Sequence, residues 1–543
     1  MTSWPILDMA TANRCYQDYI GGSDPSLHNL YEYNHLTGWE ERIQYLDQYE
    51  GLHVDRQALV RVLTDYQRAV NNEPAALEAV EKLADNQALV VVGGQQGGLF
   101  MGPLLMIYKA ISILNMAREA EQRLNRPVVP VFWLAGEDHD YDEVNHTYVL
   151  TGEPSMQRIR LGAVSDKRSP ISMMPIPQEE WDRAIQELDQ ALPNTEFKPD
   201  MIERLRAAAQ DEATLTLACA KLLGQLFGKH GLVLIDSALP ALREIERPMF
   251  EQLILHQKDL AAAVKESEAA ILDAGYLLQA EHAENSANLF LIEDGERLLL
   301  LRNGDVYEDR HGKVQYSEAQ LLELLAQQPE RFSNNVLTRP LMQDYLFPVL
   351  GTVLGPGEIA YWAQTKQSFR ALGMRMPMLW PRMGFTCVEG TLQKLLHKYE
   401  VTVEDICFRY EEKHGAWLAA QDQIQLDARF MDLRSSVDEQ YRQLLSVLAE
   451  ALPALGKLGD TNHTKVLEQI DYLHHRAKDA HSKQHDSGNR QWERLKLSLW
   501  PQDRPQERVL NPLLYECRYG HEWFLPLLEA PVTWNGEHRI VTL

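Results

Sequence analysis

The chain has 543 residues, of which 45% are hydrophobic and 24% charged, an ordinary balance for a globular protein. Because a single hydrophobic core stops growing at roughly 250 to 300 residues, two or three domains are expected. The 53 Lys and Arg residues against 78 Asp and Glu give a net charge of −25, which repels phosphate backbones and anionic membranes. Neither nucleic acid nor a membrane is therefore expected as a partner.

The first 87 residues carry polar helical patterns, with Leu59, Leu63 and Tyr66 on one face, and predict helices that pack against the first core strand. No basic patch followed by an apolar core opens the chain, and no apolar run reaches the length of a membrane span, so a cytoplasmic protein is expected. The five cysteines form no Cys-x-x-Cys pair, which disfavours disulfides and thiolate zinc sites and predicts buried spectators.

Residues 88–146 hold the pattern around which the chain is organised. A strand, ALVVV, runs into GGQQGG; an apolar helix begins near Pro103; a second strand, VVPVFWL, ends in the polar segment GEDHDYDEVNH. Two apolar runs flanking a helix predict a βαβ unit with parallel strands, and both polar segments fall at the carboxyl ends, where such sheets bind ligands. Lys109 is the exception among the apolar residues of this helix. Its side chain is expected to extend to the surface, and the alternative is that its ammonium points at the ligand site.

The next elements follow from apolar runs, turn pairs and a capping box. In chain order they are a helix over 200–229, a third strand ending at Asp236, a long helix over 240–274, antiparallel hairpins that turn at Asp294-Gly295 and Asn303-Gly304, and a helix capped by Ser317 and Gln320 that ends before Pro329.

The second half of the chain predicts more of the sheet and a coiled coil. A strand over 349–354 runs into GPGE, which opens another helix, and MPMLWPR adds one more strand. Two helical stretches with apolar spacings of 4, 3 and 4, separated by residues 453–463, predict an antiparallel coiled-coil hairpin. The apolar seam positions of these two helices are Val437, Tyr441, Leu444 and Leu448 in the first and Val466, Ile470, Leu473 and Ala477 in the second. The tail, VTWNGEHRIVTL, predicts a hairpin at its Asn-Gly pair.

The turn GGQQGG is the first candidate binding element. Unhindered backbone N–H groups before a helix suit a phosphate or a carboxylate. The sequence is neither GxGxxG nor GxxxxGK[ST], so a tight structural turn is the alternative. Gln95 and Gln96 bring amide groups where small residues would suffice, and with Gly97 and Gly98 they are candidate ligand-binding residues.

The segment GEDHDYDEVNH is denser in chemistry. Carboxylates beside imidazoles can hold a divalent metal, or they can form an acid and histidine pair that acts as a base. Glu143 and His146, at spacing three, lack the second histidine of HExxH, which favours the metal-free base, and no metal is expected. The candidates here are Glu137, Asp138, His139, Asp140, Asn145 and His146.

A second cluster surrounds GPGEIAYW. Tyr361 and Trp362 are either core residues or partners of an apolar or ring-shaped ligand part. Arg339 and Arg382 are either carboxylate clamps or members of structural ion pairs. The candidates here are Asn335, Arg339, Glu358, Tyr361, Trp362 and Arg382.

Four long blocks resemble the motifs of the bacillithiol-biosynthesis cysteine-adding enzyme family, BshC. They are GGQQGGLFMGPLLMIYKAI, PVVPVFWLAGEDHDYDEVNH, RPLMQDYLFPVLGTVLGPGEIAYWAQ and PQERVLN, in the family's order. The resemblance implies addition of L-cysteine to the amine of glucosaminyl malate by a homodimer, and a kinship of architecture with class I aminoacyl-tRNA synthetases. The place of a HIGH-type motif holds Gly94-Gln95-Gln96-Gly97, however, and no KMSKS segment is present.

The expected fold class is therefore α/β, a Rossmann-like parallel sheet core with connective-peptide insertions plus an α-helical antiparallel coiled-coil domain. The expected segments are 1–260, the N-terminal helices and first half of the core; 261–330, the connective insertion; 331–390, the second half of the core; 391–500, the coiled-coil domain; and 501–543, a return to the core.

Under the ligase hypothesis, His139, supported by Asp138 or Asp140, would take the proton from the attacking amine. Glu137 and Asn145 would fix the amine or sugar hydroxyls, Gln95 to Gly98 would hold a carboxylate or phosphate, and Arg339 or Arg382 would neutralise the malate carboxylates. A free carboxylate does not condense readily with an amine, so an activated cysteine is implied, with ATP or ADP as the candidate nucleotide. The alternatives are a metal-dependent amide hydrolase, with His139 and His146 among its ligands, and a non-catalytic nucleotide-binding scaffold.

Overall fold

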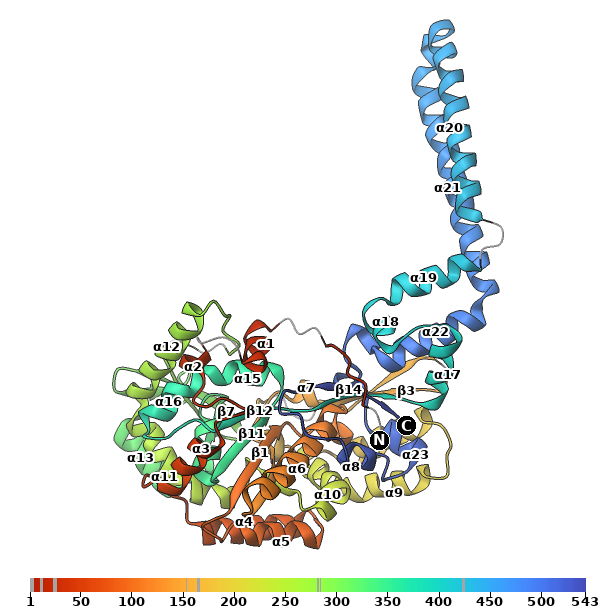
Figure 1. The fold of residues 1–543 in the computed structure, drawn as a ribbon. Coiled ribbons are helices and arrows are strands. Elements are labelled where there is room, and N and C mark those ends of the chain that lie inside the picture. The colour runs from red at the N-terminus through yellow and green to blue at the C-terminus, as the bar shows by residue number, and fades with distance from the viewer. Residues whose placement is uncertain are drawn as a thin grey trace. The chain divides into compact units, whose positions relative to one another are not determined.

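The computed structural model describes residues 4–9, 13–22, 27–152, 154–163, 167–280, 283, 285–421 and 425–543. The chain forms two compact units, one made of Met1–Cys387 with Arg504–Leu543 and the other of Val388–Asp503 (Figure 1). The expected α/β class, with a parallel sheet and a helical coiled coil, is confirmed. The finer division into five segments stays a prediction.

A five-stranded parallel sheet lies at the centre of the larger unit and confirms the predicted strands. Almost all of its residues are buried, as in parallel sheets covered on both faces. Because the strands are parallel, the polar segments that follow them meet at one edge. In spatial order the strands are β12 (Met378–Pro381), β11 (Val349–Leu354), β1 (Leu89–Gln95), β2 (Val128–Leu134) and β5 (Val233–Asp236).

Helices from the first part of the chain pack around this sheet. α6 (Leu105–Leu124) follows Pro103 as predicted, is buried along most of its length and ends at Asn125 in the left-handed conformation. The predicted N-terminal helices are also confirmed, and α4 and α5 contact β5 and β2. These helices are α1 (Arg14–Gly21), α2 (Leu27–Leu30), α3 (Trp39–Gln48), α4 (Arg56–Ala69) and α5 (Pro74–Lys82).

Both long helices expected over 200–229 and 240–274 are interrupted. Between α9 (Lys198–Ala208) and α10 (Leu215–Phe227), Asp211 and Glu212 adopt left-handed backbone with φ of 62° and 52°. Between α11 (Pro240–Leu255) and α12 (Gln257–Asp273), the chain breaks at His256, where ψ is 16°. Helical apolar spacing continues on both sides of each break, so periodicity alone does not reveal them.

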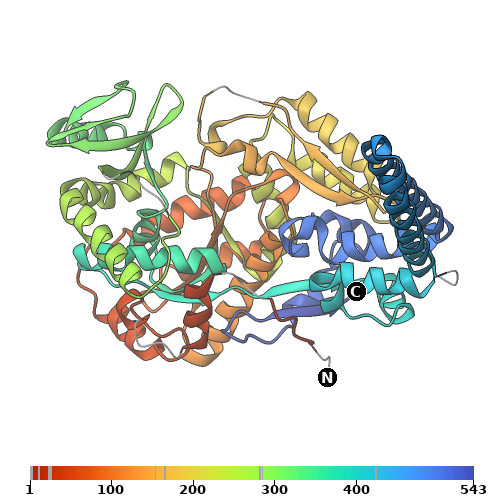
Figure 2. The same cartoon turned by 90° about the horizontal axis from the view of Figure 1, so that it is seen from above.

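The antiparallel insertion is confirmed as a second five-stranded sheet, drawn in green at the periphery of the larger unit in Figure 2. β6 and β7 pair through the turn at Asp294-Gly295, and the capping box of Ser317 and Gln320 opens α13 (Glu318–Gln327) as predicted. In spatial order the strands are β10 (Phe332–Asn334), β6 (Ser286–Glu293), β7 (Glu296–Asn303), β8 (Val306–Glu308) and β9 (Gln315–Ser317).

The smaller unit contains the predicted antiparallel hairpin, formed by α20 (Leu426–Ala451) and α21 (Gly456–Gln484), the long pair in Figure 1. Asp427 lies 2.7 Å from His474, and Tyr441 donates to Asn462 at 2.6 Å, so the helices run in opposite directions.

One predicted seam position in each helix is wrong. Leu444 and Leu473 are 52% and 58% exposed, while their neighbours Leu445 and His474 are partly buried. A helix drifts against a strict heptad, which makes adjacent positions hard to separate by spacing. The unit also contains α17 (Gly390–Lys398), α18 (Val403–Phe408), α19 (Tyr410–Ala420) and α22 (Asp486–Leu499).

The predicted C-terminal hairpin is wrong, because β14 (His538–Thr542) pairs with β13 (Gly384–Val388), which ends at the first residue of the smaller unit. A further antiparallel pair, β3 (His146–Leu150) with β4 (Met156–Arg160), was not predicted.

All five cysteines are buried, as expected. Within the described ranges, no helix is long and apolar enough to cross a bilayer. The remaining helices include α8 (Gln178–Ala191), α16 (Lys366–Ala371), α23 (Leu513–Tyr519) and α24 (Leu525–Leu528).

Candidate active site

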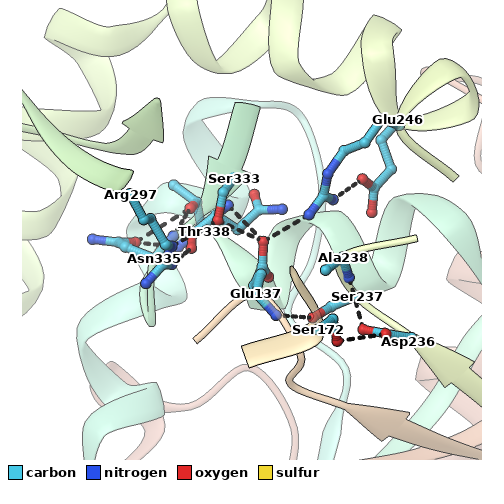
Figure 3. A network of polar contacts seen from close by, with 12 residues as sticks. Glu137, Ser172, Asp236, Ser237, Ala238, Glu246, Arg297, Ser333, Asn335 and Thr338 are labelled. Carbon is cyan, nitrogen blue, oxygen red and sulfur yellow. Dashed lines mark hydrogen bonds and ion pairs between the residues drawn. The ribbon is translucent and has the colours of Figure 1, made fainter. Parts of the chain in front are cut away.

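The carboxyl edge of the parallel sheet gathers polar groups from several strand ends. Gly136 lets the segments after β2 and β5 approach each other, since a Cβ there would lie 1.9 Å from Ser172 Oγ and 2.2 Å from Asp236 Oδ1. Figure 3 shows Ser172 bonded to Asp236 at this point, at 2.6 Å. Burial raises the pKa of Asp236 to about 6, although hydrogen bonds from Ser172 and the Ala238 N–H oppose the shift.

Glu137 is the centre of a buried network that ties the antiparallel insertion to this edge (Figure 3). Its Oε2 accepts hydrogen bonds from Arg243 Nη2 at 2.9 Å, Ser333 Oγ at 2.8 Å and the Asn334 N–H at 3.0 Å. Arg243 also pairs with Glu246. A carboxylate shared by three donors is suited to anchoring, and the predicted role of Glu137 toward the amine or sugar hydroxyls stays a prediction.

His139 is held from the side of the insertion by Arg297 of β7. Arg297 Nη1 lies 2.9 Å from His139 Nδ1, and the guanidinium carbon lies 3.7 Å from the ring centroid of Phe290. Burial and the charge of Arg297 lower the pKa of His139, while Asp140 and Asp138 act in the opposite direction. Asp140 Oδ1 is 3.8 Å from Nε2. The ring is therefore a neutral imidazole at neutral pH.

Gln96 and Asp138 join the loops that follow β1 and β2. Gln96 Nε2 donates to Asp138 Oδ2 at 2.6 Å, and Asp138 Oδ1 accepts the His139 backbone N–H at 2.7 Å. Asp138 therefore orients the backbone of His139 and the amide of Gln96. The two polar segments that the sequence placed at one edge do meet here.

Lys109 is 1% exposed and belongs to the site, so the expected surface position is wrong. Its Nζ donates to Gly94 O at 2.6 Å, to Gln95 Oε1 at 3.2 Å and to Glu358 Oε2 at 2.6 Å. Burial lowers the pKa of Lys109 although Glu358 opposes this. For Glu358, burial alone would raise the pKa, but Lys109 and Arg339 hold it below its usual value. Three acceptors, two of them on β1, therefore hold the Lys109 ammonium in the buried interior of the site.

Arg339 and Tyr361 extend the cluster from α14 (Arg339–Leu346) and α15 (Pro356–Trp362). Arg339 Nη2 donates to the Tyr361 hydroxyl. Burial alone would lower the pKa of Arg339, but Tyr361 and the carboxylates of Glu358, Glu137 and Asp138 raise it.

Trp362 fits the alternative that it is a core residue. It is 1% exposed and stacks on Phe369 with ring centroids 6.3 Å apart.

Arg382 fits the ion-pair alternative. It pairs with Glu507 through both terminal nitrogens, with Nη1 3.0 Å from Oε2, and both side chains are buried. Glu507 belongs to the PQERVLN block. In the same block, Asn511 Nδ2 donates to the carbonyl oxygens of Phe100 at 3.0 Å and Gly102 at 2.8 Å. This block therefore holds the loop after β1 in place.

Gly97 and Gly98 are closely packed. A Cβ at Gly97 would lie 3.0 Å from Thr216 Cα, and one at Gly98 would lie 3.1 Å from Gly102 Cα. A 3-10 turn, Leu99–Met101, separates these glycines from the first turn of α6. The tight-turn alternative accounts for the glycines, and the binding of a carboxylate or phosphate by Gln95, Gln96, Gly97 and Gly98 stays a prediction.

Asn145 and His146 make local contacts, whereas Asn335 also reaches β6, where its Nδ2 donates to Asn288 Oδ1 at 2.8 Å. Asn145 Nδ2 donates to Asp142 Oδ1 at 3.2 Å, and His146 Nδ1 lies 3.1 Å from the Asp142 carbonyl oxygen. Asn335 Oδ1 accepts hydrogen bonds from two backbone N–H groups of its own turn.

In the part of the chain that the structure describes, no group of three or more His, Cys, Asp or Glu side chains is arranged to hold a metal ion. The ligand set of the hydrolase alternative is therefore not assembled there.

Sequence reasoning missed Arg297 and Ser333, which the second sheet contributes. Asn334 is 1% exposed, and among the described residues neither its Nδ2 nor its Oδ1 has a hydrogen-bond partner. The pair Asn334-Asn335 was a visible polar signal. No pattern marked Arg297, because an arginine beside a hairpin turn is ordinary.

A parallel sheet with a polar carboxyl edge, joined in one chain to a helical coiled-coil unit, defines an α/β protein with a Rossmann-like core. Two family models match, "Bacillithiol biosynthesis BshC, N-terminal Rossmann-like domain" over residues 3–383 and "Bacillithiol biosynthesis BshC, C-terminal coiled-coil domain" over residues 385–543. Relatives from Bacillus anthracis, Bacillus thuringiensis subsp. konkukian and Bacillus cereus, each named "Putative cysteine ligase BshC", are 33% identical over 529 residues, which is 97% of this chain and 97% of each relative. The chain belongs to the BshC family and is an enzyme of the ligase class.

Proposed function

We propose that this enzyme joins L-cysteine to the amine of glucosaminyl malate and so forms the amide bond of bacillithiol. Family membership supports bacillithiol biosynthesis, and the relatives are named as cysteine ligases. The observation that carries the proposal is the alternation of cations and carboxylates at one sheet edge, where Lys109 contacts Glu358 and Arg243 contacts Glu137. Both substrates carry amine and carboxylate groups, which such an edge can bind.

The reaction needs an activated cysteine carboxylate. The amine nitrogen attacks the activated carbonyl carbon, a C–N bond forms, and the bond to the phosphate or adenylate leaving group breaks and gives that group its electron pair. The amine loses one proton. ATP is the proposed activating co-substrate, and Gln95 to Gly98 are the proposed contacts of the carboxylate or phosphate. The proposal includes a cytoplasmic homodimer and no metal.

The test is mass spectrometry of paired reactions that contain purified protein, L-cysteine and glucosaminyl malate, with and without ATP. The amide is expected only with ATP, and AMP or ADP among the products identifies an adenylate or a phosphate intermediate. Absence of the amide in both reactions, from protein that is folded by circular dichroism, overturns ATP-dependent ligation. Hydrolysis of the product, or nucleotide binding without turnover, then favours the hydrolase or the scaffold.

A matched pair of variants locates the chemistry. His139→Ala is expected to lower turnover by about 10² or more, the range in which positioned proton-transfer and hydrogen-bonding groups act. His311→Ala, at an exposed turn of the insertion, is expected to keep wild-type turnover. Equal turnover of the two variants contradicts the placement of the site at His139.

A further inference from the structure

We propose that Arg297 is a positioning residue that fixes His139 as a neutral imidazole with its proton on Nε2. His139 then donates a hydrogen bond to the reacting group, and the amine proton goes to another acceptor. The catalytic consequence depends on the proposed function, whereas the tautomer itself does not.

The tautomer follows from the 2.9 Å contact between Arg297 Nη1 and His139 Nδ1. A guanidinium has only N–H donors, so Nδ1 must accept with its lone pair. A neutral imidazole has one such lone pair, and its other nitrogen therefore carries the hydrogen. Nε2 of His139 is an N–H donor in this arrangement and has no lone pair for an amine proton.

Arg297 is itself held in place from several sides. Its Nε donates to Ser333 Oγ at 2.9 Å, its Nη2 donates to the Asn334 carbonyl oxygen, and its guanidinium lies over the Phe290 ring. The side chain belongs to a residue that is only 8% exposed. Because Ser333 also bonds to Glu137, the network that anchors the insertion also orients the histidine.

The charged groups that face His139 agree with a donor at Nε2. They are Arg297 from β7, Asp138 and Asp140 from its own loop, and Arg168. Both oxygens of Asp138 already accept hydrogen bonds, from Gln96 and from backbone N–H groups. Asp140, whose side chain is 48% exposed and lies 3.8 Å from Nε2, is the carboxylate assigned to take the amine proton.

The role of His139 is thus reversed from the one the sequence suggested. When the amine attacks the activated cysteine, negative charge develops on the former carbonyl oxygen, and a preorganised N–H group stabilises it. The Nε2–H of His139 supplies that hydrogen bond. The amine proton passes to Asp140, so the charges balance without protonating the imidazole.

The test is nitrogen NMR of the full chain labelled with ¹⁵N in the histidine rings, with the His139 signals identified by their loss in His139→Gln. Between about pH 6 and 8, wild-type His139 is expected to show an unprotonated Nδ1 and a protonated Nε2. Arg297→Met is expected to mix the tautomers and to raise the pH at which His139 titrates by about one unit. A wild-type His139 protonated at Nδ1 overturns the proposal, even if the variant fails to fold.

Arg302→Met is the matched control, because Arg302 lies on the same strand and also covers an aromatic ring, that of Tyr307, at 5.0 Å. Its His139 signals are expected to match wild type. Equal His139 spectra in wild type, Arg297→Met and Arg302→Met overturn the assignment of Arg297. The measurement uses ligand-free protein, so a failure of the ligation assay leaves this result interpretable.

Discussion

Lys109 and Glu358 are 249 positions apart in the chain and form an ion pair of 2.6 Å at the carboxyl edge of the parallel sheet. Lys109 comes from the helix after β1, and Glu358 from the helix after β11. The pair therefore ties the two halves of the sheet together at the edge where the candidate site lies.

Glu358→Gln is expected to destabilise the larger unit by about 3 to 5 kcal/mol, because it leaves the Lys109 ammonium buried without its counter-charge. The measurement is the midpoint of chemical denaturation. Lys82→Met is the control, since Lys82 and its partner Glu121 are 46% and 42% exposed, and such pairs contribute less than about 1 kcal/mol. Equal midpoints for the two variants would contradict the prediction.

The Asp236 carboxyl gives the stability a specific pH dependence. Burial raises its pKa from the usual 3.8 to about 6, so between these values the folded protein binds a proton that the unfolded chain releases. The contribution of this group to the free energy of unfolding therefore falls as the pH rises through that window. Asp236→Asn is expected to gain stability relative to wild type over the same window, measured by thermal melts. A stability difference between Asp236→Asn and wild type that stays constant across the window would contradict the prediction. Asp259→Asn is the control, because that side chain is 70% exposed.

Asn334→Leu is expected to raise the denaturation midpoint. A buried amide without partners costs about 1 to 3 kcal/mol, which an apolar side chain of similar size avoids. Asn115 is the matched control, because it is 4% exposed but bonded to the Ala530 carbonyl oxygen and to Arg118. Asn115→Leu is expected to lower the midpoint. A similar loss in both variants would show that the Asn334 amide is satisfied in solution.

Leu445→Ala is expected to lower the thermal midpoint of the coiled-coil hairpin, followed by circular dichroism, by more than Leu444→Ala. Leu445 faces the partner helix, since a Cβ on Gly459 would lie 2.3 Å from its Cδ2. Leu444 is 52% exposed, and surface substitutions usually change stability by less than about 0.5 kcal/mol. The reverse order would restore the seam predicted from heptad spacing.

Local patterns in the sequence predicted much of the fold. Short apolar runs predicted the parallel strands, Asp294-Gly295 predicted a hairpin, and Ser317 with Gln320 predicted a helix start. Each of these depends on residues close together in the chain. The breaks near Asp211 and His256 were not predictable in this way, because backbone conformation changes there without a change in apolar spacing.

The site was predictable only as far as its strand ends. The parallel arrangement brings Gln96 and Asp138 together, and the sequence indicated this meeting. The contact between Arg297 and His139 joins residues 158 positions apart, one on β7 and the other in the loop after β2, and no local pattern encodes it. For Lys109, burial depended on acceptors on β1 and on Glu358, 249 positions away, and a single amphipathic side chain gives no sign of these.

The return of residues 504–543 to the larger unit has a consequence during synthesis. The ribosome delivers Arg382 well before Glu507, its partner 125 positions later, and β13 well before β14. A nascent chain that has extended only past the coiled-coil hairpin therefore contains all five parallel strands, but it lacks the Glu507 carboxylate that pairs with Arg382 and the strand that pairs with β13. Residues 504–543 supply both partners, so these contacts of the larger unit form only after the smaller unit has been synthesised.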